Sequence, residues 1–251
     1  MGVAIRLIAN VLLAAAAICA TAPALAGEKL KTDWIVQPIQ TPDAPVRASP
    51  GDEILRQRVL PRGVAVLRDL YTESGARWTV QPGTELFEAQ GSAAAIYCPL
   101  DNRPPSSLVK ILSVSPSNDH LCFIDRDRDG CFEMSFRTVN SYSDLPGVFG
   151  SIMPSDKRIT PLRYEVVDPT SLSRETTVTL RYARRKGNRL EFTVAYGWPE
   201  RLTAVPGPRV SIKTLPARFE LLGGRFVVTE VNGNDIVVEV DRTMPEGPIG
   251  K

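Results

Sequence analysis

The sequence of 251 residues contains only one histidine, His120, and four cysteines. A histidine general base or a Ser-His-Asp triad would have to use His120, and no Gly-x-Ser-x-Gly motif accompanies it. Zinc sites need several histidine or cysteine ligands, which this composition does not supply. We therefore expect a protein that is not an enzyme. A hydrolase that uses a carboxylate pair is the alternative, because the spacing of such a pair is set by the fold.

The sequence also has little excess of charge of either sign. It carries 30 lysines and arginines against 28 aspartates and glutamates, whereas a nucleic-acid-binding domain usually has a concentrated basic face. We therefore expect no nucleic-acid partner. The densest basic cluster, Arg184 to Asn188 with Arg181 and Arg189 beside it, has two interpretations. It either contacts an anionic surface, such as lipopolysaccharide or phospholipid head groups, or keeps an exposed hairpin soluble, and we favour the second.

Long apolar runs are absent beyond the first 26 residues. Arg6 precedes an apolar stretch from Leu7 to about Ala22, and Ala24-Leu25-Ala26 has the small-x-small pattern of a signal-peptidase site. The run is shorter than the roughly 20 residues of a spanning helix. Residues 1–26 are therefore predicted to be a signal peptide, which implies an exported protein, periplasmic or extracellular, with no transmembrane segment after cleavage.

Cleavage would leave three cysteines: Cys98, Cys122 and Cys131. An oxidising compartment favours a disulfide, and an odd number leaves one thiol unpaired. Cys98 and Cys122 both lie in segments with the composition of strands, so we expect them to pair. The alternative, a bond between Cys122 and Cys131, would close a short acidic loop.

Helical periodicity is missing as well, because 21 prolines and 18 glycines interrupt the chain along its length. The best helix candidate, Asp52 to Val59, is short. Apolar and polar residues alternate in two predicted hairpins, 177–182 with 190–196 and 225–231 with 236–240. The fold class is therefore predicted to be all-β, an antiparallel β-sandwich or two small β units.

The spacing of turn residues predicts how the exported chain is divided. Prolines 38, 42 and 45 mark an extended segment in which residues 34–36 dock as a strand. The predicted parts are a leader or linker at 27–49, a β domain with the cysteines at 50–145, a linker at 146–160, a C-terminal β unit at 161–243 and a frayed tail at 244–251.

Carboxylates are concentrated at one place between two predicted strands. Asp125, Asp127 and Asp129 alternate along the chain and are followed at once by Gly130. Three carboxylates so close together repel each other unless a cation lies between them, and a glycine allows the backbone to turn sharply around it. This stretch resembles the loop of EF-hand and other DxDxDG calcium-binding proteins, over residues 125–136 only.

The resemblance implies a calcium site in which the Cys131 carbonyl and the Glu133 side chain join the three aspartates. It departs from an EF-hand at position 12, where Phe136 replaces the bidentate glutamate, and in its strand-like flanks. We expect a calcium loop on a β-hairpin, short of one ligand unless Asp119 or Asp144 folds in. The alternative is a solvated acidic turn in which Arg126 and Arg128 pair with the aspartates.

These features predict an exported binding or structural protein of the cell envelope, with an unidentified envelope component or glycan as its partner. Trp78 and Trp198 are candidates for stacking on a sugar, although a tryptophan at a strand end more often covers a core.

Overall fold

The computed structural model describes residues 30, 32–73, 78–91, 94–99, 119–139, 151–152, 157–198 and 201–249. Within these ranges every strand pairing is antiparallel. The helical element found in them is one short 3-10 turn, η2 (Pro169–Ser171). No helix in the described part is long and apolar enough to cross a bilayer. The prediction of an antiparallel all-β protein is confirmed.

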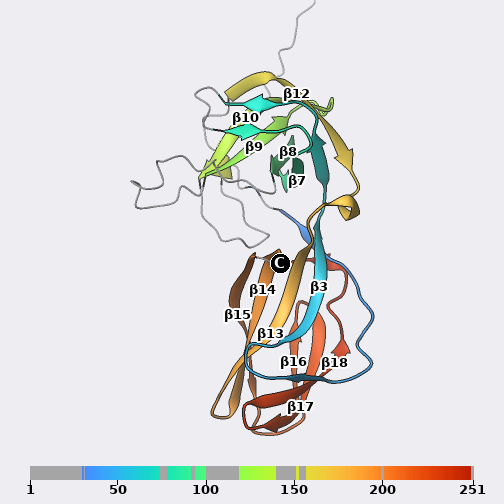
Figure 1. Cartoon of the computed structure of the whole chain (residues 1–251), viewed down its shortest axis with the longest axis vertical. Helices are drawn as coiled ribbons and strands as arrows, with labels where there is room; N and C mark the ends of the chain where they lie inside the picture. Colours follow the sequence, from blue (N-terminus) through green and yellow to red (C-terminus); the bar gives the residue numbers. More distant parts are fainter. Residues whose placement is uncertain are drawn as a thin grey trace, which may run out of the picture.

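The upper lobe in Figure 1 is a closed barrel of six strands. Strand β9 pairs with both β8 and β10, so the ring has no free edge. The short strand β11 (Ser151–Ile152) pairs with the far end of β10. In ring order the barrel strands are β10 (Cys131–Val139), β12 (Lys157–Val167), β4 (Val64–Leu67), β7 (Glu85–Gln90), β8 (Ala95–Pro99) and β9 (Asp119–Asp125).

The interior of the barrel is filled by side chains from all six strands. Leu67, Leu86 and Phe123 are among the fully buried members. The small ribbon of β5 (Tyr71–Thr72) and β6 (Thr79–Val80) adds Tyr71 and Val80 to this cluster. A second cluster, with Phe87 and Ile96, lies on the other face of β7 to β10. The barrel therefore has a packed core and is not a pore.

The lower lobe consists of two sheets that face each other across one hydrophobic core (Figure 1). One sheet has six strands, in the order β15 (Arg201–Ser211), β14 (Arg189–Trp198), β13 (Thr176–Lys186), β3 (Glu53–Pro61), β1 (Trp34–Val36) and β19 (Gly247–Pro248). The other has four, in the order β16 (Ala217–Leu221), β17 (Gly224–Asn232), β18 (Asp235–Arg242) and β2 (Val46–Ala48).

Both predicted hairpins are present, as β13–β14 and β17–β18. Val178, Leu180 and Tyr182 of β13 point into the shared core, as their alternation predicts. The first turn is tighter than expected: strand pairing continues to Lys186 and Arg189, leaving Gly187 and Asn188 as the turn, with Gly187 at φ +58°. A two-residue turn with positive φ suits the twist of paired strands.

Two predictions about the chain outside the hairpins are wrong. The helix candidate at Asp52 to Val59 is the strand β3, because six of its residues pair with β13 and its apolar side chains enter the core. The tail is docked and does not fray over the residues described, since Gly247 and Pro248 pair with β1. Met244 and Ile249 anchor it by burial.

The two lobes do not follow one another along the sequence. Strand β3 belongs to the lower lobe and β4 to the barrel, and the chain returns through β12 in the barrel to β13 in the lower lobe. The segment predicted to be a linker at 146–160 contains β11 and the start of β12, and both strands pair with β10 of the barrel. Leu60, Val64 and Leu172 form a small buried cluster where the two connections pass between the lobes.

Candidate metal centre

The acidic loop joins β9 to β10 at one end of the barrel, and both of its flanks are strands, as predicted. Asp125 ends β9 and Cys131 begins β10, so five residues form the connection. The strands on either side are held in register by pairs such as Ile124 with Met134. The loop is therefore carried on a rigid hairpin and not between helices.

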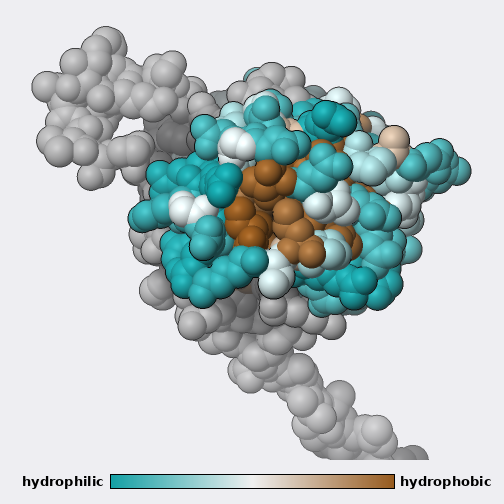
Figure 2. Space-filling model, turned by 90° about the horizontal axis from the view of Figure 1, so that it is seen from below, coloured by the Kyte–Doolittle hydropathy of each residue, from teal (hydrophilic) through white to brown (hydrophobic). Residues whose placement is uncertain are grey.

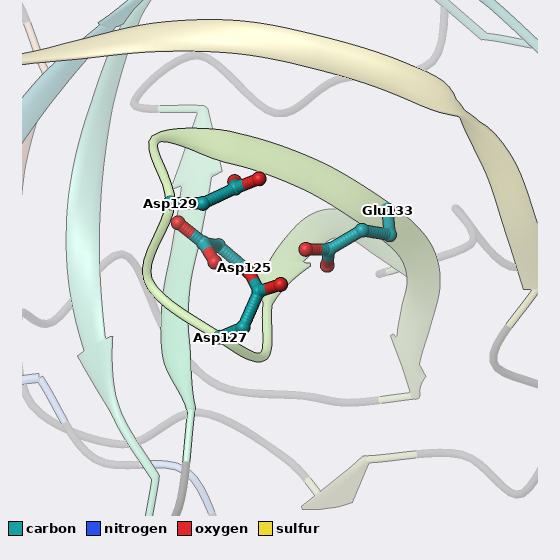
Figure 3. Close-up of side chains that lie close together, drawn as sticks. All are labelled: Asp125, Asp127, Asp129 and Glu133. Carbon is teal, nitrogen blue, oxygen red and sulfur yellow. The ribbon is translucent and has the colours of Figure 1, made fainter.

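Four carboxylates meet at this loop (Figure 3). Asp125, Asp127, Asp129 and Glu133 each offer an oxygen, and these oxygens all lie within 4.8 Å of one another. The four acidic side chains that the sequence pattern selects are thus brought together by the fold. A cluster of this kind has the hard oxygen donors that calcium prefers.

Asp125 is the fixed member of the cluster and is completely buried. Its Oδ1 accepts a hydrogen bond of 2.6 Å from the Arg128 amide, and its Oδ2 accepts one of 3.1 Å from the Gly130 amide. Asp127 and Asp129 are exposed, and Asp129 Oδ1 accepts a bond of 2.8 Å from the Cys131 amide. One wall of the cluster is therefore held by backbone amides while two carboxylates face solvent.

Two residues of the loop have positive φ, which allows the chain to turn around the carboxylates. Gly130 has φ +89°, a conformation that glycine adopts at no steric cost. Arg128 has φ +61°, which is uncommon for a residue with a side chain. The sharp backbone turn that the sequence predicts at Gly130 is therefore present. The left-handed conformation of Arg128 is a second feature of this loop, which the sequence does not indicate.

Glu133 comes from β10 and reaches back toward the loop (Figure 3). Its side chain accepts a hydrogen bond of 3.2 Å from the Arg126 amide. The pairing of β10 with β12 shifts register between Phe132 and Met134, opposite a stretch of β12 that contains Pro161. Proline cannot donate to the ladder, and a bulge there re-aims side chains. Burial first, and then the neighbouring Asp127 and Asp125, raise the pKa of Glu133.

Tyr164 is a site residue that the sequence pattern does not reveal. Its hydroxyl donates a hydrogen bond of 2.7 Å to Asp125 Oδ2, and its amide donates to the Gly130 carbonyl at 3.1 Å. Its ring stacks on Phe132 with centroids 4.2 Å apart. Burial, followed by the hydrogen bond to Asp125, raises the pKa of the Tyr164 hydroxyl. No local signal identifies Tyr164, because β12 meets the loop only through barrel pairing.

Asp119 and Asp144 are the two further ligands considered for this loop, and neither is placed at the site by the described residues. Asp119 begins β9 and Asp125 ends it, so at about 3.3 Å per residue they are separated by roughly 20 Å and Asp119 does not complete the site. Asp144 lies outside the described residues. Phe136, at the position of the EF-hand glutamate, is buried in a hydrophobic cluster. A ligand role for the Cys131 carbonyl stays a prediction.

The predicted disulfide is confirmed between Cys98 of β8 and Cys122 of β9, with Cα atoms 4.3 Å apart. The register that pairs Tyr97 with Phe123 places the two cysteines opposite each other at the next step. Cys131 is the free thiol among the described cysteines. Burial and the adjacent carboxylates raise its pKa, which disfavours the reactive thiolate.

The remaining candidates do not gather into a second site. Trp78 is buried in the barrel core and cannot stack on a sugar. Trp198 is half-buried, and the guanidinium of Arg174 lies over its ring at 5.1 Å from the centroid. His120 lies in β9, but its side chain is outside the described part of the structure.

A comparison with protein-family models, curated proteins and solved structures found no match to this chain. Its function is therefore inferred from the chemistry of its own residues.

Proposed function

We propose that this protein is an exported binding or structural component of the cell envelope whose acidic loop binds calcium. The observation that carries the calcium proposal is the meeting of four carboxylate oxygens within 4.8 Å, one of them from the fully buried Asp125. Like charges this close destabilise the loop, and a divalent cation between them offsets that repulsion.

The composition of the site favours weak binding. Calcium takes six to eight oxygen ligands, and the exposure of Asp127 and Asp129 leaves room for water to complete the shell. The missing bidentate glutamate and the positive charges of Arg126 and Arg128 both lower the affinity. We expect a dissociation constant typical of extracellular modules, on the order of 10⁻⁴ to 10⁻³ M.

Three features support export. The first 26 residues have the pattern of a signal peptide, the Cys98–Cys122 disulfide suits an oxidising compartment, and the loop has the composition of a weak extracellular calcium site. Mass spectrometry of the protein isolated from its host should find Gly27 at the N-terminus. Recovery of the full-length chain from the cytoplasm would contradict this part of the proposal.

The distances favour a structural cation over carboxylate catalysis. A glycosidase-type hydrolase holds two carboxyl groups about 5–10 Å apart on either side of a substrate. Here one oxygen from each of four carboxylates lies within 4.8 Å of the others, which is closer than that separation. We therefore infer that the cation orders the end of the barrel that presents the loop, which would position that surface for an envelope component or a glycan.

The decisive experiment is thermal unfolding with and without calcium. A cation that binds only the folded state adds about 2.7 kcal/mol at a hundredfold excess over its dissociation constant. The melting temperature should rise with millimolar calcium and much less with magnesium, which demands stricter geometry. Asp127→Asn should remove most of the calcium-dependent rise in melting temperature. Asp43→Asn, which changes an exposed aspartate of the other lobe, should leave that rise intact. An unchanged wild-type melting curve would show that the loop is only an acidic turn.

A further inference from the structure

Two hairpin turns lie side by side at the end of the lower lobe that is remote from the barrel (Figure 1). They are Gly187–Asn188 of β13–β14 and Gly233–Asn234 of β17–β18, and with Arg185 they line a shallow groove. The Arg185 guanidinium donates to the Gly233 carbonyl at 2.8 Å and to the Gly187 carbonyl at 3.0 Å. One cationic side chain thus ties the turns of the two sheets together.

The strand geometry explains why Arg185 takes this position. Pairing of β13 with β14 shifts register between Tyr182 and Arg184, after which Arg185 pairs with the buried Leu190. Arg185 therefore shares the core-facing side of the sheet, while Arg184 is turned out and pairs with Glu191 at 2.7 Å. From the core-facing side, the Arg185 guanidinium reaches the Gly233 carbonyl in the turn of the facing sheet.

Apolar side chains are accessible to solvent beside these turns. Figure 2, seen from this end, shows a contiguous apolar patch surrounded by hydrophilic residues. Ile212 adjoins the first turn, because its amide donates to the Asn188 carbonyl at 2.9 Å. Val231 pairs with Ile236 next to the second turn, and Leu215, between β15 and β16, is 43% exposed. We call the two turns together with these three residues the turn surface.

Basic residues predominate around the turn surface. Lys186 and Arg189 are exposed at the first turn. Arg184 of β13 and Arg209 of β15 both pair with Glu191 of β14, so these two cations lie on either side of one carboxylate. The side-chain bond from Arg184, and then the charges of Arg209 and Lys186, lower the pKa of Glu191. Of the acidic residues at this end, Glu191 is paired with Arg184, and Asp235 accepts a bond of 2.8 Å from the Ser49 hydroxyl. Two further acidic residues here are exposed: Asp52 accepts a bond of 2.8 Å from the Ser49 amide, and Glu230 accepts one of 3.5 Å from the Asn232 side chain.

We propose that the turn surface docks on the surface of a bilayer that contains anionic phospholipids. Its apolar centre would enter the boundary between head groups and acyl chains, and its basic rim would contact lipid phosphates. The sequence alone favours a solubilising role for these cations, but the apolar patch beside them favours contact with an anionic surface. An apolar patch alone would fit many partners, whereas the surrounding cations select an anionic one. This surface and the acidic loop are in different lobes, so the proposal does not depend on the metal site.

The test is sedimentation of the mature protein with vesicles of equal parts phosphatidylcholine and phosphatidylglycerol. A chelator is included so that calcium cannot bridge protein and lipid. The protein should sediment with these vesicles at low salt and dissociate from them as the salt concentration rises. It should not bind vesicles of phosphatidylcholine alone. Each cation near the membrane surface raises the binding constant about fivefold, so the double variant Lys186→Gln with Arg189→Gln should weaken vesicle binding about thirtyfold. Leu215→Ser should weaken it through the apolar contact.

Matched controls on the barrel separate this surface from general charge and apolarity. Lys157→Gln with Arg158→Gln removes the same charge from exposed positions of β12. Val166→Ser removes a side chain that is 62% exposed. Neither should change vesicle binding. Equal binding to neutral vesicles, no binding at low salt, an equal loss in the control variants, or self-association that Leu215→Ser abolishes would each overturn the proposal.

Discussion

The hydroxyl of Tyr164 donates a hydrogen bond of 2.7 Å to Oδ2 of Asp125, which lies 39 positions earlier in the chain and is completely buried. The Tyr164 amide also donates to the carbonyl of Gly130 in the same loop. Strand β12 therefore holds the first and last residues of the acidic turn at once. The loop is shaped by the barrel as well as by its own sequence.

Tyr164→Phe should destabilise the calcium-free protein by about 1.5–3 kcal/mol, the usual contribution of a hydrogen bond to a charged group. Tyr71→Phe is the matched control, because its hydroxyl bonds the neutral Ser135 hydroxyl at 3.1 Å and should cost only about 0.5–1.5 kcal/mol. Urea unfolding measures both. Equal losses in the two variants would show that the Tyr164 hydroxyl does not anchor Asp125.

Substitutions at Arg128 separate the backbone of the loop from its charge. Arg128 has φ +61°, so Arg128→Gly should be more stable than Arg128→Ala by about 1 kcal/mol, since alanine still carries a Cβ in the left-handed region. Both variants remove a positive charge beside the carboxylates, so both should bind calcium more tightly than the wild type. Calcium titration followed by melting temperature measures the charge effect, and unfolding in chelator measures the backbone effect. Equal stability of the two variants would contradict the backbone assignment.

Asp69 should titrate far below an ordinary aspartate. Side-chain hydrogen bonds from Arg163, then the Arg163 amide, lower its pKa from 3.8 to about 2. Because the folded pKa is depressed, the stabilisation is fully present above pH 3.8 and is lost as the pH falls to about 2. Carboxyl NMR should show this titration.

In Arg163→Gln the Asp69 pKa should move back toward its ordinary value, because only the backbone amide still donates. Arg225→Gln, which removes the partner of Asp241 in the lower lobe, should leave Asp69 unchanged. A wild-type Asp69 that titrates near 3.8 would contradict the pairing with Arg163.

Local features of this protein could be predicted because the residues that form them are close in sequence. The β13–β14 hairpin follows from alternation and a turn with glycine, and the carboxylates of Asp125, Asp127 and Asp129 meet because a five-residue connection leaves them little freedom. The disulfide could be selected because both Cys98 and Cys122 belong to strands that the sequence identifies.

Features that join distant segments could not be predicted in this way. Nothing near Glu53–Pro61 indicates that this segment pairs with Thr176–Lys186 and is a strand, not a helix. The same holds for the docking of Gly247 on Val36 and for Tyr164, which reaches Asp125 only after the barrel closes.

The physical reason is the range of the interactions. Side-chain periodicity and turn conformation are set by neighbours along the chain, so the sequence by itself determined the all-β class, the two hairpins and the acidic turn. Which strands become neighbours depends on two opposing contributions to the free energy of folding. One is the apolar surface that each arrangement buries, and the other is the entropy lost on closing the long loops between the strands. That balance involves the whole chain, and so the tertiary structure alone decided the barrel, the two-sheet lobe and the residue that holds Asp125 in place.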